Sequence, residues 1–231
     1  TFKSSTLWNY ELGLRTDWLD RTLRLDLTLF HLDWSNPQIS QSTRTGLAGF
    51  VDNVGGSRSN GAEATLRWLT PLPGLSLNSA ASYIVARSTE AFDSANGERI
   101  APGTDMPLSP EVQIANTVAL STLKGRWLLG RQLMHSYQGA AWNNIEHEQR
   151  VYGFSSYSLG FSLARPDLRY RPALTFSAAN LTDEREVIGA ASGGVTPLLT
   201  ALPVTYDRPR TFGVGLTAKF EAAVAGVLAL M

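Results

Sequence analysis

The sequence predicts an all-β fold, an antiparallel transmembrane β-barrel segment of about nine strands. Apolar and polar residues alternate with a period of two along most of the chain, which is the spacing of side chains on opposite faces of a strand. The connections between these segments are short and long in turn. The longest apolar run, 222–231, is far shorter than the roughly 20 residues of a membrane-spanning helix, so a bilayer could be crossed only by a closed barrel.

The first three predicted strands, within 8–15, 23–29 and 61–68, each have one apolar face and one polar face. The apolar residues are Trp8, Tyr10, Leu12 and Leu14, then Leu23, Leu25, Leu27 and Leu29, then Ala62, Ala64, Leu66 and Trp68. Six more strands follow by the same pattern, at 75–85, 112–120, 127–137, 157–163, 171–181 and 212–220. Nine is an odd number, so the first and last strands run in the same direction, whereas bacterial single-chain barrels have an even, antiparallel count. The segment is therefore expected to need further strands to close.

The connections separate by length, which favours a membrane barrel. Tight turns are predicted near 20, 71–74, 124–125 and 166–167, and long polar loops at 36–57, 88–109, 139–151 and 182–208. Transmembrane barrels have short periplasmic turns and longer extracellular loops. Tryptophan and tyrosine also gather near predicted strand ends, where amphipathic rings reach the headgroups: Trp8, Tyr10, Trp18, Trp34, Trp68, Tyr83, Trp127, Tyr137 and Tyr157. The alternative is a soluble β-sandwich, in which these aromatic residues would belong to an ordinary core.

Composition argues against several classes of function. Lys plus Arg is 20 and Asp plus Glu is 20, so no overall field would attract nucleic acid. Cysteine is absent, which removes disulfides, thiolate metal sites and cysteine nucleophiles. Glu146-His147-Glu148 lacks a second histidine at helical spacing, and no glycine-rich run is followed by the Lys-Ser/Thr of a phosphate loop. We therefore expect no catalytic site, no metal and no cofactor.

The candidate ligand-binding residues lie in the predicted long loops, where binding residues of membrane barrels collect. They are Arg44, Arg99, Trp142, His147, Arg150 and Tyr206. Arginine suits carboxylate or phosphate groups of a chelate, and aromatic rings suit flat or sugar-like surfaces. Ordinary solvated loop chemistry is the competing interpretation for each of them.

Five stretches occur in the order and spacing of a known family. They are 53–63 (NVGGSRSNGAE), 71–75 (PLPGL), 107–110 (PLSP), 179–183 (ANLTD) and 207–216 (DRPRTFGVGL). Together they resemble the C-terminal part of the β-barrel of TonB-dependent outer-membrane receptors. The resemblance implies a 22-stranded barrel in the bacterial outer membrane, with a plug domain inside it and an N-terminal box that contacts TonB.

The resemblance also implies the function and partners. Such a receptor takes up a scarce ligand, such as a ferric siderophore, cobalamin or a carbohydrate, with energy relayed by TonB. A passive porin-like channel is the alternative. Outer-membrane lipid, the missing plug and strands, and the barrel-assembly machinery are the expected partners. The alternating residues Phe212, Val214 and Leu216, with the terminal aromatic Phe220, resemble the signal that this machinery reads.

The expected division of the chain is 1–220 for the barrel part and 221–231 for a tail foreign to the family. The tail is rich in alanine and leucine and could form a short helix. It is interpreted as a frameshift, vector or gene-fragment product, or else as a periplasmic extension. The first residues, 1–5, contain neither an initiator methionine nor a charged and then apolar signal region. The chain is therefore expected to begin within a longer protein.

Overall fold

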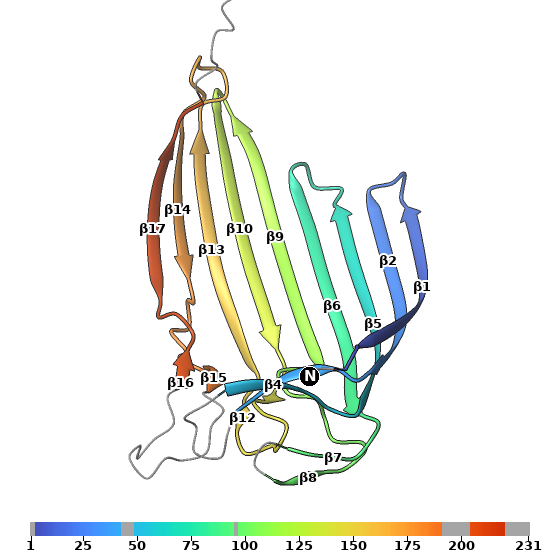
Figure 1. Cartoon of the computed structure of the whole chain (residues 1–231). Coiled ribbons are helices and arrows are strands. Elements are labelled where there is room, and N and C mark those ends of the chain that lie inside the picture. Colours follow the sequence, from blue (N-terminus) through green and yellow to red (C-terminus); the bar gives the residue numbers. More distant parts are fainter. Residues whose placement is uncertain (1–2, 43–48, 95–96, 191–203, 220–231) are drawn as a thin grey trace, which may run out of the picture.

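The computed structural model describes residues 3–42, 49–94, 97–190 and 204–219, and its main feature is one nine-stranded antiparallel sheet (Figure 1). In spatial order its strands are β1 (Thr6–Trp18), β2 (Leu23–Ser35), β5 (Gly56–Leu69), β6 (Leu75–Ser88), β9 (Val112–Lys124), β10 (Trp127–Gln138), β13 (Phe154–Ala164), β14 (Ala173–Ala179) and β17 (Thr211–Thr217). Each of these nine strands pairs with the next of the nine along the chain, so the sheet is an up-and-down meander. The nine predicted strands are confirmed.

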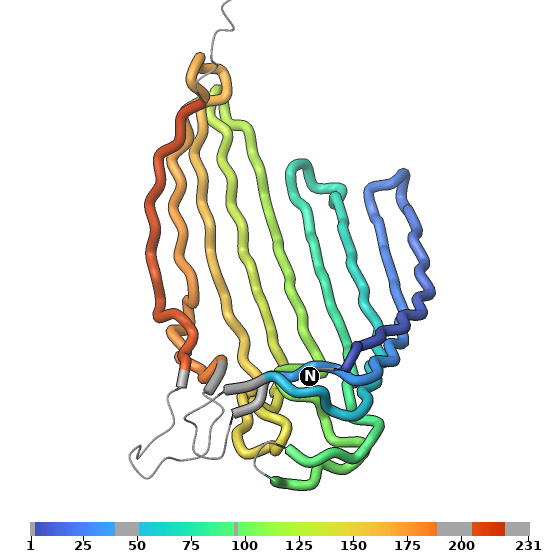
Figure 2. Tube along the Cα trace, viewed as in Figure 1, coloured from blue at the N-terminus to red at the C-terminus, as the bar shows by residue number. Residues whose placement is uncertain are grey.

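Four short ribbons lie in the predicted long loops. They are β3 (Gln38–Ser42) with β4 (Gly49–Asn53), β7 (Phe92–Asp93) with β8 (Arg99–Ile100), β11 (Ala141–Trp142) with β12 (Arg150–Val151), and β15 (Val187–Ala190) with β16 (Val204–Tyr206). Alternation did not predict them, because two to five residues are too few to show a period. Figures 1 and 2 show the ribbons at one end of the sheet and the tight turns at the other.

The tight turns depend on left-handed backbone. Leu19, Asp20 and Arg21 have φ of 52°, 55° and 66° between β1 and β2, and Gly125 has φ of 62° between β9 and β10. Gly74, before β6, has φ of 80°, and a Cβ there would lie 1.9 Å from the carbonyl oxygen of Ser121. Glycine is therefore required at position 74 both by conformation and by the close approach of the next hairpin.

The eighth predicted strand, 171–181, is longer than the strand in the structure, β14. Arg171 has φ of 40°, which an extended strand does not allow, and Pro172 has no N–H to donate to a ladder. At the other end Asn180 has φ of 50° and leaves the strand. The alternation of residue types continued past both ends, but the backbone geometry did not.

The last strand was predicted to end at Phe220, and β17 ends at Thr217. Its partner β14 starts only at Ala173, after Pro172, so the ladder ends there. The chain still runs beside the preceding turn, since the N–H of Lys219 donates to the carbonyl oxygen of Tyr170 at 2.8 Å. Phe220 and the tail 221–231 lie outside the described residues.

The strand registers place the predicted apolar residues on one face of the sheet. Cα partners across successive strands form rows, and one row is Leu12, Leu29, Ala62, Tyr83 and Val112. The opposite face is rich in small and polar residues and holds ion pairs between Arg15 and Asp26 and, at 2.7 Å, between Arg24 and Asp17. The two-faced character predicted from the period of two is confirmed.

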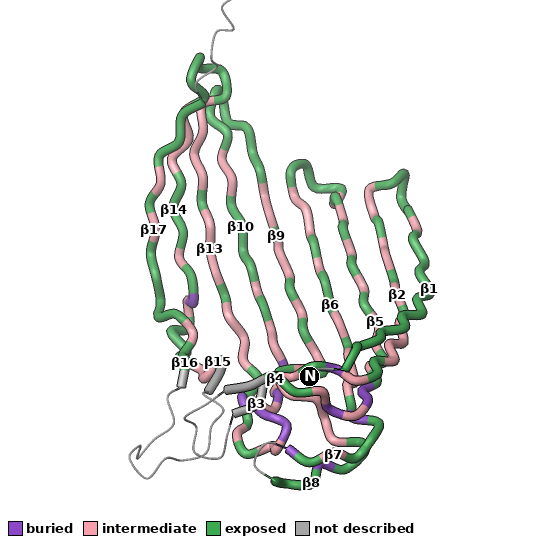
Figure 3. Tube along the Cα trace, viewed as in Figure 1, coloured by how far each residue is buried: buried purple, intermediate pink, exposed green. Residues whose placement is uncertain are grey.

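No second sheet covers the apolar face within the described residues. Leu12 on β1 is 71% exposed and Leu216 on β17 is 77% exposed. The buried hydrophobic residues instead gather at the long-loop end (Figure 3): Val54, Ile100, Ala141, Ile145 and Val151. This arrangement contradicts the β-sandwich alternative, which requires an apolar face packed against a partner sheet. In the described part of the chain, no helix has the length and apolarity to cross a bilayer.

Candidate functional site

Three of the predicted ligand-binding residues come together in the ribbon β11–β12. Trp142 and Arg150 are direct partners in its register, and the Cζ atom of Arg150 lies 5.7 Å from the centroid of the Trp142 ring. The ring of His147 stacks on the same indole, with centroids 4.6 Å apart and an angle of 6° between the planes. The ribbon therefore places an indole, an imidazole and a guanidinium side by side, and their role in ligand binding stays a prediction.

The loop between β11 and β12 is held by its own amide side chains. Asn144 donates to the carboxylate of Glu148 and accepts from the backbone N–H of Glu148, both at 3.0 Å. His147, with φ of 58°, lies in the left-handed region. Its Nε2 is 2.9 Å from the carbonyl oxygen of Asp105, which can only accept, so Nε2 carries a proton.

A cavity of about 320 Å³ opens beside this cluster. Its wall includes Trp142, Arg150, Asp105, Glu111 and Tyr137. The carbonyl oxygen of Trp142 accepts from the N–H of Leu108 at 2.7 Å, which ties the ribbon to the segment before β9. Cationic, anionic and aromatic groups thus meet at the long-loop end of β6, β9 and β10.

The other predicted site residues do not join this cavity. Arg99, on β8, forms an ion pair with Asp93 of β7 at 3.0 Å, and both side chains are about two-thirds exposed. Tyr206, on β16, pairs with Val187 and is 56% exposed. Neither lines the cavity among the described residues, and Arg44 lies outside them.

Sequence reasoning did not select three residues of the cavity, Asp105, Glu111 and Tyr137. Tyr137 was counted only among the aromatic residues of strand ends, and Asp105 stands two residues before the 107–110 motif. The sequence did carry a signal for Glu111, because this residue directly follows Pro110 and precedes β9. A residue in that position lies where the long loop joins the strand. The side chains converge only through the register of β6, β9 and β10.

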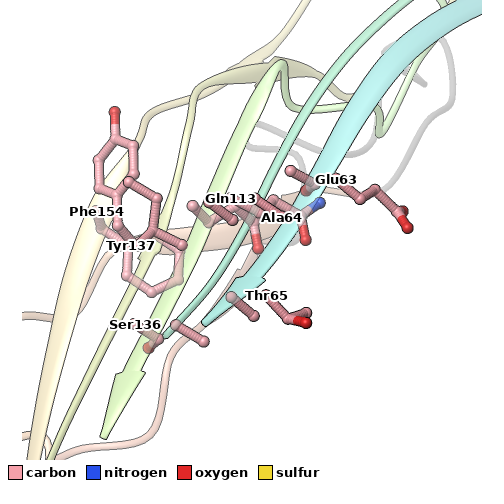
Figure 4. A pocket seen from close by; sticks show the side chains of 13 residues that line it. Glu63, Ala64, Thr65, Gln113, Ser136, Tyr137 and Phe154 are labelled. Carbon is pink, nitrogen blue, oxygen red and sulfur yellow. The ribbon is translucent and has the colours of Figure 1, made fainter. Parts of the chain in front are cut away.

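The polar face of the sheet carries a second, wider hollow of about 450 Å³ (Figure 4). One register row across five strands forms much of its wall: Glu63, Ser82, Gln113, Gln138 and Phe154. The next row contributes Thr65, Ala80, Ala115 and Ser136. These side chains are small or uncharged except for Glu63, so the surface suits close contact with another polar surface.

Two motif asparagines fasten the ends of the long loops. The side-chain amide of Asn180 donates to the carbonyl oxygens of Glu184 at 2.7 Å and Arg208 at 2.8 Å, and Asn180 is buried. Asn53 donates to the carbonyl oxygen of Asn36 at 2.9 Å and accepts from the N–H of Lys3 at 2.7 Å. The 179–183 and 53–63 motifs therefore contain residues that join the two ends of a loop.

The carboxyl group of Asp183 continues this clamp. The backbone N–H of Arg210 donates to it at 2.8 Å, and this hydrogen bond lowers the pKa of Asp183 below its ordinary value. The clamp therefore depends on an ionised aspartate. In the described part of the chain, no group of three or more His, Cys, Asp or Glu side chains is placed to hold a metal ion.

Residues 1–181 match the family model described as TonB dependent receptor-like, beta-barrel. Similar solved structures include the ferric yersiniabactin uptake receptor FyuA from Yersinia pestis, with 19% identity and a TM-score of 0.71 over 95% of this chain and 31% of that one. The siderophore receptor PiuA from Acinetobacter baumannii has 17% identity and a TM-score of 0.67 over 93% of this chain and 28% of that one. The ferric citrate transporter FecA has 20% identity and a TM-score of 0.66 over 92% of this chain and 31% of that one.

Because the sequence identities to these solved structures are low, the structures support the fold of this chain and nothing finer. This chain spans less than one third of each of them, and its nine-stranded sheet corresponds to part of a larger barrel. The apolar face is thus the lipid-facing side of the wall, the polar face is the lumen side, and the long loops are extracellular. The chain belongs to the TonB-dependent receptor β-barrel family, whose members are outer-membrane proteins.

Proposed function

We propose that this chain forms part of the wall and extracellular rim of an active outer-membrane transporter, which takes up a scarce ligand such as an iron–siderophore complex with energy relayed by TonB. The Trp142–His147–Arg150 cluster beside a rim cavity is the observation that supports ligand capture. The names of FyuA, PiuA and FecA support an iron chelate as the ligand class. The same names support transport and not catalysis.

The cavity chemistry supports a ligand with both donor and acceptor groups. Arg150 can donate to carboxylate or catecholate oxygens, and the stacked rings of Trp142 and His147 add aromatic surface. Glu111 adds negative charge to the same wall, and Asp105, which is paired with Arg87 at 3.0 Å, adds carboxylate oxygens. The wall therefore suits a ligand that also carries amide or hydroxyl donors.

We propose a different partner for each face of the sheet. The lumen hollow around Gln113 and Glu63 is the surface for the plug domain, and TonB contacts parts of the receptor beyond this chain. The lipid-facing residues Phe212, Val214 and Leu216, with Phe220, are the segment for the barrel-assembly machinery.

Uptake of radiolabelled iron by cells that carry the complete receptor tests the proposal. Iron is supplied in turn as a hydroxamate, a catecholate and a citrate complex. One class is expected to enter saturably at low external concentration, and its uptake is lost when TonB is deleted. Uptake that persists without TonB and rises linearly with concentration would instead establish a passive channel.

Substitutions at the rim test the proposed capture surface. Trp142→Ala and Arg150→Gln are each expected to raise the half-saturating ligand concentration about tenfold, which corresponds to about 1.4 kcal/mol of lost contact. Tyr152→Ala is the matched control, because Tyr152 is an exposed aromatic residue next to β12 and does not line the rim cavity among the described residues. Equal effects of Trp142→Ala and Tyr152→Ala would contradict a ligand site at the cluster.

A further inference from the structure

Positive charge is concentrated in the short turns on the β9–β17 side of the sheet. The turn between β9 and β10, the turn between β13 and β14 and residues 218–219 after β17 carry the acidic residue Asp167 and a set of cations. The other two short turns, 19–22 and 70–74, carry only Asp20 and Arg21, whose charges cancel. We call the cations the basic turn cluster: Arg126, Arg165, Arg169, Arg171 and Lys219.

Contacts between the turns bring the cluster together. The Cζ atom of Arg165 lies 5.0 Å from the centroid of the Trp127 ring, which joins the β13–β14 turn to the start of β10. The backbone N–H of Lys219 donates to the carbonyl oxygen of Tyr170 at 2.8 Å, which brings the end of β17 to the same turn. Three segments that are distant in sequence therefore form one surface.

Asp167 balances one cation of the cluster. Arg165 donates to its two carboxylate oxygens at 2.9 and 3.0 Å. This contact, together with the positive charge of Arg126, lowers the pKa of Asp167 below its ordinary value. In the described part of the chain, no ion pair engages Arg126, Arg169, Arg171 or Lys219, and all four are exposed. The cluster therefore keeps an excess of positive charge that faces water.

The β13–β14 turn projects past the ends of the strands (Figure 1). It covers residues 165–172, whereas the β9–β10 turn consists of 125–126. The N–H of Leu168 donates to the carbonyl oxygen of Arg165 at 3.3 Å, and the N–H of Arg171 donates to that of Leu168 at 2.9 Å, so the turn has a defined shape. Trp127 and Lys124 are register partners on the lipid-facing side, where such residues mark the headgroup level. The projecting turn reaches beyond that level into the periplasm.

We infer that the basic turn cluster docks on peptidoglycan, the carboxylate-bearing glycan of the periplasm. Guanidinium and ammonium groups pair with carboxylates, and Leu168 and Tyr170, 44% and 45% exposed, add apolar surface for sugar rings. Inner-leaflet phosphates lie at the level of Trp127, so the polyanion that the projecting arginines meet is the glycan. The inference rests on the orientation of the barrel and is independent of the transported ligand.

Co-sedimentation of the complete receptor in detergent with protein-free peptidoglycan sacculi tests the docking. The receptor is expected to sediment with sacculi at about 0.1 M salt and to be released at about 1 M, since the Debye length shortens from about 10 Å to about 3 Å. Sacculi with amidated carboxylates are expected to retain about tenfold less receptor. Equal retention by native and amidated sacculi overturns the inference without any variant having to fold. Binding to phosphatidylglycerol vesicles but not to sacculi would assign the cluster to lipid and also overturns it.

Two double variants with the same change in net charge then locate the surface. Arg126→Gln with Arg169→Gln is expected to lower the fraction bound to sacculi about fivefold. Arg21→Gln with Arg67→Gln is the matched control, because it removes two exposed arginines from the β1–β2 turn and from the lumen face of β5, and it is expected to bind as wild type. Equal losses in the two double variants, or undiminished binding by the first, overturn the assignment to this cluster.

Discussion

Single side chains decide where the long loops begin and end. Asn180 has φ of 50° and is buried, and its side-chain amide donates hydrogen bonds to the carbonyl oxygens of Glu184 and Arg208. The motif around Asn180 was predictable as a family feature from the sequence. Its physical role was not, because Arg208 is 28 positions away and only the fold brings it near.

Replacing Asn180 by alanine is expected to leave two carbonyl oxygens without donors and to impose a left-handed backbone on alanine. The expected cost is about 1–3 kcal/mol in the free energy of unfolding, which urea titration of the complete receptor in detergent would measure. Asn78→Ala, at an exposed position on the lumen face of β6, serves as the control. Equal unfolding midpoints for the two variants would show that the clamp does not hold the loop.

The Asp183 contact predicts a dependence on pH. Its pKa is lowered by the N–H of Arg210, so the charged form stabilises the fold at pH values above the ordinary value of 3.8. That contribution is lost as pH falls through the lowered pKa of the folded state. The stability difference between wild type and Asp183→Asn is expected to shrink below about pH 4. A difference that stays constant from pH 7 to pH 3 would contradict the assignment.

The site residues illustrate the same limit of prediction. Trp142, His147 and Arg150 share one loop, so sequence alone could group them. Asp105 and Tyr137 join them through the pairing of different strands, and no local pattern reports such pairing. Arg99 has the expected chemistry but is committed to Asp93 on its own ribbon.

Strands could be predicted from the sequence wherever apolar and polar residues alternate along the whole hydrogen-bonded segment. All nine long strands were predicted, because a period of two needs about six residues to show and most of these strands exceed ten. The short ribbons were missed because their strands have only two to five residues. The ends of β14 depended on backbone conformation at Arg171 and Asn180 and on the missing N–H of Pro172. The predicted boundary between 1–220 and 221–231 stays a prediction.

The turn at Gly74 offers a test at the scale of a hairpin. Gly74→Ala meets both an unfavourable φ of 80° and the carbonyl oxygen of Ser121, so the β5–β6 hairpin must move away from β9. Gly125→Ala has a comparable φ of 62° but open space around its Cβ. We expect Gly125→Ala to cost about 1 kcal/mol and Gly74→Ala to cost more, about 3 kcal/mol, in urea unfolding. Equal costs would show that only backbone strain matters.

The whole sheet is stabilised by its surroundings, because its apolar face has no protein partner in the described residues. Lipid must therefore cover this face along β1 to β17. The assignment of faces could be predicted from alternation and from the sorting of loops by length. Their identity as lipid side and lumen side required the family match.

Adjacent residues on β14 test this assignment. Phe176→Arg places a charge on the lipid-facing side near the middle of the strand and is expected to cost about 2–4 kcal/mol of unfolding free energy in lipid vesicles. Thr175→Arg places the same charge on the lumen side and is expected to cost less than about 1 kcal/mol. A larger loss for Thr175→Arg would reverse the two faces.

The buried apolar residues of the described chain sit under the extracellular rim, and they come from three separate loops: Val54, Ile100 and the set Ala141, Ile145 and Val151. Ala141 also lines the rim cavity, so the proposed ligand surface and these buried residues belong to the same end of the sheet. Exchanging one of these loops for that of another receptor would remove buried apolar side chains as well as exposed ones, so a graft has to keep the buried positions apolar.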